Sequence, residues 1–167
     1  MKMKNVLKLF LTVFVAIALY SPLHAQSEKQ QKKAAEASML ASAIDKQHYI
    51  FKAQTMLPMT GFTRQLDGGY DLTISTDQIN SFLPYMGRIY SPPMDPSQGP
   101  LRFASKDFEY IAQPAKDNGW NISIKPKDVN SVRQMNLSIS GDGAATLQVS
   151  SNDRQPVTFY GYITEKE

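Results

Sequence analysis

The side chains that most often perform catalysis or bind metals are scarce in this chain. Its 167 residues include no cysteine and two histidines, His24 and His48. With no thiolate and so few imidazoles, neither a cysteine nucleophile nor a zinc site with several Cys or His ligands can be built. A serine triad would need His48, yet no Gly-x-Ser-x-Gly turn and no glycine-rich phosphate loop is present. We therefore predict no catalytic residue, no metal site and no cofactor.

Asp107 and Glu109 form the one arrangement that would suit acid–base chemistry. Residues two apart on a strand face the same way, so both carboxylates could flank a glycosidic bond. Such pairs are also common on exposed strands, and Lys106 and Lys125 would balance these two charges. We interpret the pair as surface residues and keep glycan hydrolysis as the alternative.

The segment from Pro84 to Pro100 has an unusual composition for a loop. Its five prolines in 17 residues exclude a continuous helix or a central strand. It also carries apolar and aromatic residues, including Tyr85 and Tyr90, which indicates that it packs across one end of a sheet or binds a partner. We predict an ordered loop organised by Arg88, because Gly87 permits a turn that directs the guanidinium inward or toward a ligand.

The first 25 residues have the order of a secretory signal peptide. Three lysines precede the apolar run Leu9–Tyr20, and Ala25 offers a small residue at the cleavage position. The run of twelve is shorter than the roughly 20 residues that span a bilayer, although an uncleaved anchor is the alternative. We predict cleavage after Ala25, export to the periplasm or cell exterior of a Gram-negative bacterium, and no membrane span after cleavage.

Removal of this segment changes the charge balance of the protein. The chain has 18 basic and 15 acidic residues, and the loss of three lysines leaves 15 of each. A neutral chain has no electrostatic footprint for nucleic acid. With 42% hydrophobic and 20% charged residues, the remainder is typical of one globular domain.

The sequence predicts a helix over residues 26–46 and a single antiparallel β domain over residues 47–167. The helical segment from Ser27 has no glycine or proline, and its second half has apolar residues at helical spacing. Within the β domain we predict strands at 48–56 and 70–74 and a short helix at 76–83. The helix is indicated by Thr76 as N-cap and Pro84 as terminator.

The C-terminal half alternates apolar and polar residues in five runs, which predicts a five-stranded meander. Turn lengths that keep every apolar residue on one face pair Ala112 with Ile124, Ile122 with Met135, Ile139 with Ala145, and Val149 with Val157. Gly119 would take the left-handed turn position. The predicted fold class is mainly β (α+β): an N-terminal helix plus a curved antiparallel sheet of about seven strands, with a partly closed barrel as one arrangement. The predicted core includes Trp120, Ile122, Met135, Leu137, Leu147 and Phe159.

The opposite face of the meander is polar and lightly charged. Antiparallel sheets commonly expose one face to water, so a solvated face is one interpretation. A concave binding surface that uses Tyr160 and Tyr162 is the other. The residues of this face are Asp107, Glu109, Gln113, Asn121, Ser123, Lys125, Gln134, Asn136, Ser138, Thr146, Gln148, Thr158, Tyr160 and Tyr162.

Several segments resemble one family of exported Bacteroidota proteins, the domain of unknown function 4251 family. They are the run of six from Tyr70, the segment Leu83-Pro-Tyr-Met-Gly-Arg-Ile-Tyr-Ser-Pro-Pro, Gly119-Trp-Asn-Ile-Ser-Ile, Asn136-Leu-Ser-Ile-Ser and Ser151-Asn-Asp-Arg-Gln. The resemblance covers about residues 45–164. It implies an exported protein and supplies no activity or catalytic residue. Many relatives resemble lipoproteins, whereas this chain lacks the cysteine for such an anchor.

Taken together, these features predict an exported, non-catalytic binding or interaction module of the cell envelope. Its partner is an unknown envelope ligand or protein rather than nucleic acid. The candidate binding residues are Tyr85, Arg88, Tyr90, Tyr160 and Tyr162. The alternatives are an envelope glycan hydrolase that uses Asp107 and Glu109, and a purely structural envelope protein.

Overall fold

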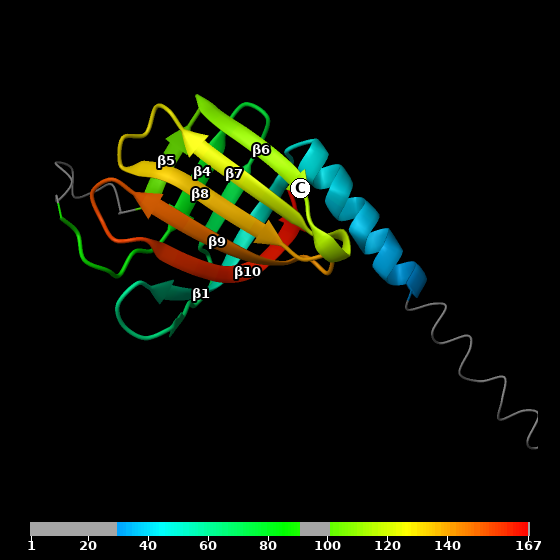
Figure 1. Ribbon diagram of the computed structural model, residues 1–167, viewed down its shortest axis with the longest axis horizontal. Helices are drawn as coiled ribbons and strands as arrows, with labels where there is room; N and C mark the ends of the chain where they lie inside the picture. The colour runs from blue at the N-terminus through cyan, green and yellow to red at the C-terminus, as the bar shows by residue number, and fades with distance from the viewer. Residues whose placement is uncertain (1–29, 91–100, 167) are drawn as a thin grey trace, which may run out of the picture. The chain divides into compact units, whose positions relative to one another are not determined.

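Figure 1 shows the computed structural model, which describes residues 30–90 and 101–166. Within these ranges the chain is mainly β, with an N-terminal helix over residues 30–45 and a sheet of ten strands. Residues from Glu36 onward form one compact unit. The predicted signal segment and the start of the predicted helix lie outside the described residues. No helix in the two ranges is long and apolar enough to cross a membrane.

The ten strands form a nearly closed, barrel-like antiparallel sheet. Their order is β5-β4-β3-β1-β10-β9-β8-β7-β6, and the short β2 pairs with β1 beside this path. The bounds are β1 Tyr49–Pro58, β2 Arg64–Gln65, β3 Asp71–Ile74, β4 Ile79–Leu83, β5 Leu101–Ser105, β6 Phe108–Pro114, β7 Trp120–Pro126, β8 Val132–Ile139, β9 Ala144–Ser151 and β10 Val157–Glu165. The short 3₁₀ helix η1 covers Lys116–Asn118.

The edge strands β5 and β6 follow one another in the chain, and Asp128 stabilises the corner between them. Ser105 Oγ donates a hydrogen bond to Asp128 Oδ1 at 2.5 Å. The backbone N–H groups of Lys106 and Asp107 donate to Asp128 Oδ2 at 2.9 and 3.3 Å. These donors stabilise the carboxylate and lower the pKa of Asp128. The corner is therefore fixed although β5 and β6 are not paired.

The predicted C-terminal meander is confirmed as β6 to β10. Two of its predicted registers are confirmed as well: Ile139 pairs with Ala145, and Val149 pairs with Val157. Both pairs flank short turns, so the local sequence was sufficient to determine which residues pair across the strands.

The other two predicted registers are wrong by two residues. Ala112 pairs with Ile122, and Ile124 pairs with Met135. A shift of two leaves every side chain on its predicted face, because side chains alternate with a period of two. The apolar pattern therefore allowed both registers.

The turns explain both differences. At β7–β8, the strands end at Pro126 and resume at Val132, so the connection is longer than a pairing of Ile122 with Met135 requires. At β6–β7, Ala115 N–H donates to Gly119 O at 2.8 Å, so the turn covers residues 116–118, one residue earlier than a pairing of Ala112 with Ile124 requires. The left-handed residues are Asp117 (φ 55°) and Asn118 (φ 57°), whereas Gly119 has φ −86°. Glycine is required at 119 for another reason, since a Cβ there would lie 2.6 Å from the carbonyl oxygen of Ile139.

The predicted short helix at 76–83 is wrong, because residues 79–83 form strand β4. Ile79, Ser81 and Leu83 are buried, whereas Asn80 and Phe82 are exposed. This alternation fits a strand with β3 on one side and β5 on the other. With β2 and β5, β4 accounts for the three strands beyond the predicted seven.

The core fills the interior between the sheet and the second half of the helix. The largest fully buried side chains are Tyr49, Phe51, Phe159, Ile44, Met56, Leu72, Ile74, Ile79, Leu101, Ile124, Met135 and Leu137. Of the six residues predicted to be buried, five are, and Trp120 is half-buried. Trp120 opens β7 beside the last residue of the edge strand β6, so it lacks full cover.

A tyrosine pair crosses the interior from β1 to β6. The hydroxyls of Tyr49 and Tyr110 lie 3.0 Å apart and form a hydrogen bond. Burial, with a smaller contribution from Tyr110, raises the pKa of Tyr49 well above its ordinary value. The pair links strands that are not neighbours in the sheet.

Candidate functional site

The structure places the five predicted binding residues in two separate groups. Tyr160 and Tyr162 project from β10 on the outer face of the sheet. Tyr85, Arg88 and Tyr90 belong to a segment that lies against the β9–β10 turn. The structure therefore brings Tyr160 and Tyr162 together on one strand, and Tyr85, Arg88 and Tyr90 together beside one turn.

The outer face of β6 to β10 carries two rows of uncharged side chains, which we call the amide–hydroxyl face. Strand register defines each row, because residues directly opposite one another share a face. One row is Tyr160, Thr146, Ser138, Asn121 and Gln113, and the other is Thr158, Gln148, Asn136, Ser123 and Ile111. Neither row contains an acidic or basic residue.

Hydrogen bonds between side chains orient the amides of this face. Gln134 Nε2 donates to Ser123 Oγ at 3.0 Å and to Asn136 Oδ1 at 2.8 Å. Ser138 Oγ donates to Asn121 Oδ1 at 3.0 Å. A depression of about 340 Å³ lies here, lined by Ile111, Gln113, Asn121, Ile122, Ser123, Asn136, Leu137 and Ser138. The face thus presents amide and hydroxyl groups of defined orientation around a hollow.

Tyr160 and Tyr162 border this face on β10. They are 42% and 43% exposed, and they point the same way because they are two residues apart. Gly161 lies between them, where a Cβ would collide with the carbonyl oxygen of Lys52 on β1. Lys52 pairs with Tyr162 across the strands, and its ammonium binds Asp71 at 2.8 Å. Lys52, a cation beside the tyrosines, is therefore neutralised by the carboxylate of Asp71.

Asp107 and Glu109 do not lie on one strand as the sequence suggested. Asp107 is in the turn before β6, and Glu109 is on β6 opposite Lys125. Both are exposed, and His48 is exposed as well. Across residues 30–90 and 101–166, no group of three His, Cys, Asp or Glu residues is arranged to hold a metal ion.

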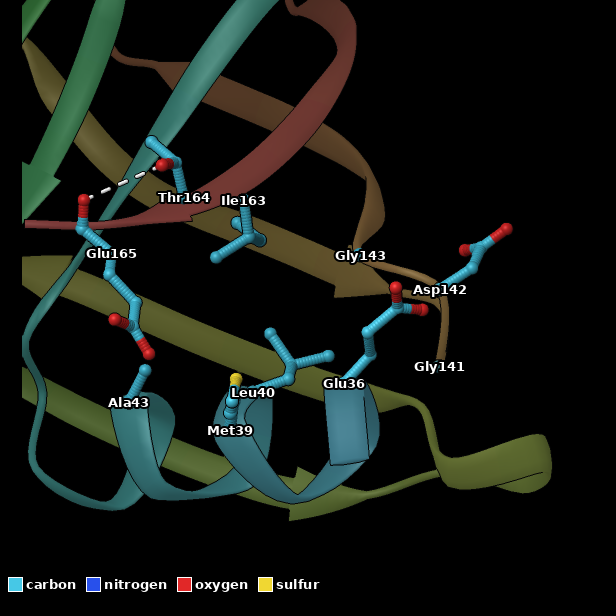
Figure 2. A pocket seen from close by; sticks show the side chains of 10 residues that line it. All are labelled: Glu36, Met39, Leu40, Ala43, Gly141, Asp142, Gly143, Ile163, Thr164 and Glu165. Carbon is cyan, nitrogen blue, oxygen red and sulfur yellow. Dashed lines mark hydrogen bonds between the residues drawn. The ribbon is translucent and has the colours of Figure 1, made fainter. Parts of the chain in front are cut away.

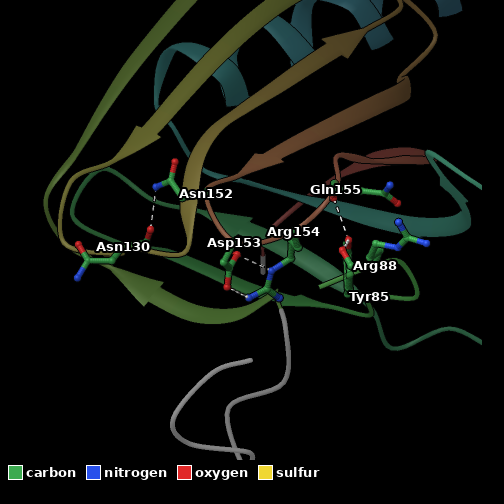
Figure 3. Close-up of polar contacts among 7 residues, drawn as sticks. All are labelled: Tyr85, Arg88, Asn130, Asn152, Asp153, Arg154 and Gln155. Atoms are coloured by element: carbon green, nitrogen blue, oxygen red, sulfur yellow. Dashed lines mark hydrogen bonds and ion pairs between the residues drawn. The ribbon is translucent and has the colours of Figure 1, made fainter. Parts of the chain in front are cut away.

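The second group is organised around Arg154, a residue that the sequence did not single out. Arg154 is 3% exposed. Its Nε and Nη2 donate to the two carboxylate oxygens of Asp153 at 2.8 and 2.6 Å (Figure 3). Its guanidinium carbon lies 5.3 Å from the centre of the Tyr85 ring. The bond from Arg154 lowers the pKa of Asp153, so this carboxylate stays charged well into the acidic range.

Backbone contacts attach the start of the predicted loop to the β9–β10 turn. The Tyr85 hydroxyl lies 2.9 Å from Arg88 O and 3.0 Å from Gln155 O (Figure 3). Tyr90 N–H donates to Asp153 O at 2.7 Å. Gln155 N–H donates to Arg88 O at 3.1 Å. Arg88 thus contributes its carbonyl to these contacts, while its side chain is exposed. Residues 91–100 of the predicted loop lie outside the described residues.

A second pocket lies between the helix, the β8–β9 turn and the end of β10 (Figure 2). Its volume is about 230 Å³. The residues that line it are Glu36, Met39, Leu40, Ala43, Gly141, Asp142, Gly143, Ile163, Thr164 and Glu165. Asp142 points away from the pocket and accepts the Ala144 N–H at 3.2 Å. The walls are mainly apolar, and the carboxylates lie at the rim.

Comparison with known proteins identifies the family. Residues 30–163 match the model of a family described as Domain of unknown function (DUF4251). The chain belongs to this family. A crystal structure of a DUF4251 family protein from Bacteroides eggerthii DSM 20697 is similar, with a TM-score of 0.59 and 15% identity over 80% of this chain and 91% of that one. No curated protein is significantly similar in sequence.

For this DUF4251 chain, the similarity to the solved structure extends to the fold. The residues that sequence reasoning missed are those of the uncharged rows and, above all, Arg154. The rows were visible as a polar face, but strand register was needed to assemble them. Arg154 belongs to the segment Ser151-Asn-Asp-Arg-Gln of the family resemblance, but its burial had no local signal, because Asn152-Asp153-Arg154 has the composition of an ordinary polar turn.

Proposed function

We propose that this protein is a non-catalytic binding module of the cell envelope that holds a neutral glycan on the amide–hydroxyl face. The observation that carries the proposal is the pair of uncharged rows across five strands, bordered by two exposed tyrosines. Sugar hydroxyls both donate and accept hydrogen bonds, as amides and hydroxyls do. The C–H faces of sugar rings pack on aromatic rings such as those of Tyr160 and Tyr162.

The absence of charge in the two rows argues against other ligand classes for this face. An anionic ligand would find no arginine or lysine to pair with there. An apolar ligand would remove the amides from water without replacing their hydrogen bonds, which costs free energy. A neutral, hydroxyl-rich polymer avoids both penalties.

The geometry of the rows suits an extended polymer. Neighbouring strands are about 4.8 Å apart, so a row offers a polar group at each strand. The bonds from Gln134 to Ser123 and Asn136 orient these groups before a ligand arrives. Such preorganisation lowers the entropy cost of binding. A chain of sugars lying along the row from Tyr160 to Gln113 would therefore meet a side-chain donor or acceptor at every strand.

The location in the cell envelope is part of the proposal and rests on the order of charged, apolar and small residues in the first 25 positions. We expect the exported protein to begin at Gln26. Intact-mass measurement of protein recovered from the periplasm tests this, and retention of residues 1–25 would contradict it.

The binding test uses peptidoglycan sacculi in co-sedimentation and three soluble neutral polysaccharides, dextran, xylan and mannan, in affinity electrophoresis. We expect at least one of these probes to bind. Tyr160→Ala and Asn136→Ala should each weaken that binding by about tenfold, the effect of losing one good contact. The matched control is Asn80→Ala, which removes an exposed amide from β4, outside the amide–hydroxyl face.

Three results would count against the proposal. The first is no binding to any of the four probes. The second is an equal loss of binding in Asn80→Ala. The third is release of reducing ends from a probe that Glu109→Gln abolishes, which would support the hydrolase alternative instead.

A further inference from the structure

Exposed apolar side chains gather at the end of the barrel where β1 ends. We call this set the apolar end patch, and its members are Met59, Phe62, Met86, Ile89 and Tyr90. Phe62 is 90% exposed and Met59 is 69% exposed. Side chains of this size are rarely so exposed in neighbouring segments unless they meet a partner or a membrane.

Hydrogen bonds show that the two segments of the patch are adjacent. Thr60 Oγ1 donates to Gln155 Oε1 at 3.2 Å. The backbone N–H of Gln155 donates to Arg88 O at 3.1 Å. Residues 59–62 and 85–90 therefore both lie against the β9–β10 turn, although they are separated in the sequence (Figure 1).

The charge of the patch is basic. The segments 59–64 and 85–90 contain two charged residues, Arg64 and Arg88, and both side chains are exposed. Asp153 beneath them is bound by Arg154. Exposed aromatic and aliphatic residues beside exposed arginines match the chemistry of an anionic lipid surface, where acyl chains lie below a layer of phosphates.

We infer that the apolar end patch docks on an anionic lipid bilayer. Phe62 and Met59 enter the boundary between headgroups and acyl chains, and Arg64 and Arg88 contact headgroup phosphates. The patch adjoins one end of the amide–hydroxyl face, because Met59 lines the same hollow as Gln148 and Thr158, whereas the row from Tyr160 to Gln113 does not line that hollow. The inference stands independently of the proposed glycan binding.

The opposite end of the barrel carries acidic side chains, which favours docking through the apolar end patch. The β8–β9 turn and the β9–β10 turn lie at the two ends of β9, so the helix pocket is far from the patch. Met39, at the helix pocket, is 61% exposed, but the carboxylates at that rim include Asp142 and Glu165 (Figure 2). Anionic lipid repels this end and attracts the other.

The experiment is co-sedimentation of the exported protein with vesicles of phosphatidylglycerol and phosphatidylethanolamine, compared with vesicles of phosphatidylcholine. We expect binding to the anionic vesicles that weakens as salt is raised. Phe62→Ser combined with Met59→Ser should lower the partition coefficient by about tenfold or more. Arg64→Gln and Arg88→Gln should each lower it about fivefold on anionic vesicles.

Met39→Ser is the matched control, because it removes an equally exposed methionine from the other end and should leave vesicle binding unchanged. All these side chains are exposed, so the melting temperature should not change; if the double variant is unstable, Phe62→Ser alone is used. The inference is overturned if no vesicles bind, if Phe62→Ser has no effect, or if Met39→Ser has the same effect. It is also overturned if Phe62→Ser instead abolishes a dimer seen by analytical ultracentrifugation. Tyr160→Ala should leave vesicle binding intact, which separates this inference from glycan binding.

Discussion

Asp153→Asn tests the buried ion pair that attaches residues 85–90 to the β9–β10 turn. The substitution keeps the size of the side chain and removes its charge. The Arg154 side chain, which is 2% exposed, then loses the carboxylate that binds it at 2.6 Å. A buried guanidinium that gives up a bound carboxylate loses more than the bond itself, because hydration does not compensate its charge.

The structure sets the size of the effect. Removal of one partner from a fully buried ion pair costs about 3–5 kcal/mol. Here Asp153 keeps 19% of its side chain exposed, and the Tyr85 ring remains 5.3 Å from the guanidinium carbon. Solvent screening and this cation–π contact, worth about 0.5–2 kcal/mol, both reduce the loss. We expect Asp153→Asn to lower the free energy of unfolding by about 2–4 kcal/mol.

The same pair makes a prediction about pH. The pKa of Asp153 is lowered from its ordinary value of 3.8, chiefly by the hydrogen bond from Arg154. A carboxyl whose folded pKa is depressed stabilises the fold above its unfolded pKa, and this contribution is lost as pH falls through the folded pKa. The stability difference between wild type and Asp153→Asn should therefore shrink as pH falls below about 4.

Urea unfolding followed by the fluorescence of Trp120, the single tryptophan, measures both effects at neutral pH and at about pH 3. The control is Asp107→Asn, an exposed carboxyl that should change stability by less than about 0.5 kcal/mol. A loss below about 1 kcal/mol at neutral pH, or a difference that stays constant with pH, would refute the reasoning about Arg154.

Three further predictions concern the barrel. Leu137→Ala should lower the free energy of unfolding, measured in urea, by about 3–5 kcal/mol, because Leu137 is 1% exposed. The control, Ser138→Ala on the outer face, should lower it by less than about 1 kcal/mol. Similar losses in the two variants would mean that the faces are assigned incorrectly. Gly161→Ala should cost at least about 2 kcal/mol by the same measurement, since its Cβ would collide with the β1 backbone. The raised pKa of Tyr49 means that its contribution is complete below the unfolded value of 10.0 and is lost as pH rises through the folded value. Alkaline titration should therefore destabilise wild type more steeply than Tyr49→Phe, and parallel curves would show that the Tyr49–Tyr110 pair plays no part.

The meander illustrates what local sequence can predict. Side-chain alternation in the C-terminal half assigned the buried and exposed faces correctly, including the outward positions of Tyr160 and Tyr162. Short turns also set two registers. At β6–β7 the turn lies one residue earlier than expected, and because the same apolar pattern allows pairings that differ by two residues, Ala112 was paired with Ile124 instead of Ile122.

Strand β4 illustrates what local sequence cannot predict. Thr76 and Pro84 are placed as helix boundaries, and five residues are too few for periodicity to decide between helix and strand. The outcome depended on β3 and β5, which offer backbone partners on both sides. Burial of Ser81 is possible because its hydroxyl donates to Leu101 O at 2.7 Å, across a gap of 20 residues.

The sequence by itself determined the mainly β class, the two faces of the meander and the scarcity of catalytic side chains, because composition and alternation are properties of short segments. Only the tertiary structure decided how the exposed residues are grouped. The Tyr85 hydroxyl donates to the carbonyl oxygen of Gln155, which is 70 residues away in the sequence. Arg154, the residue before Gln155, is buried beside this contact. The amide–hydroxyl face and the apolar end patch both arise from such long-range pairing, whose register and partners depend on the closure of the whole sheet.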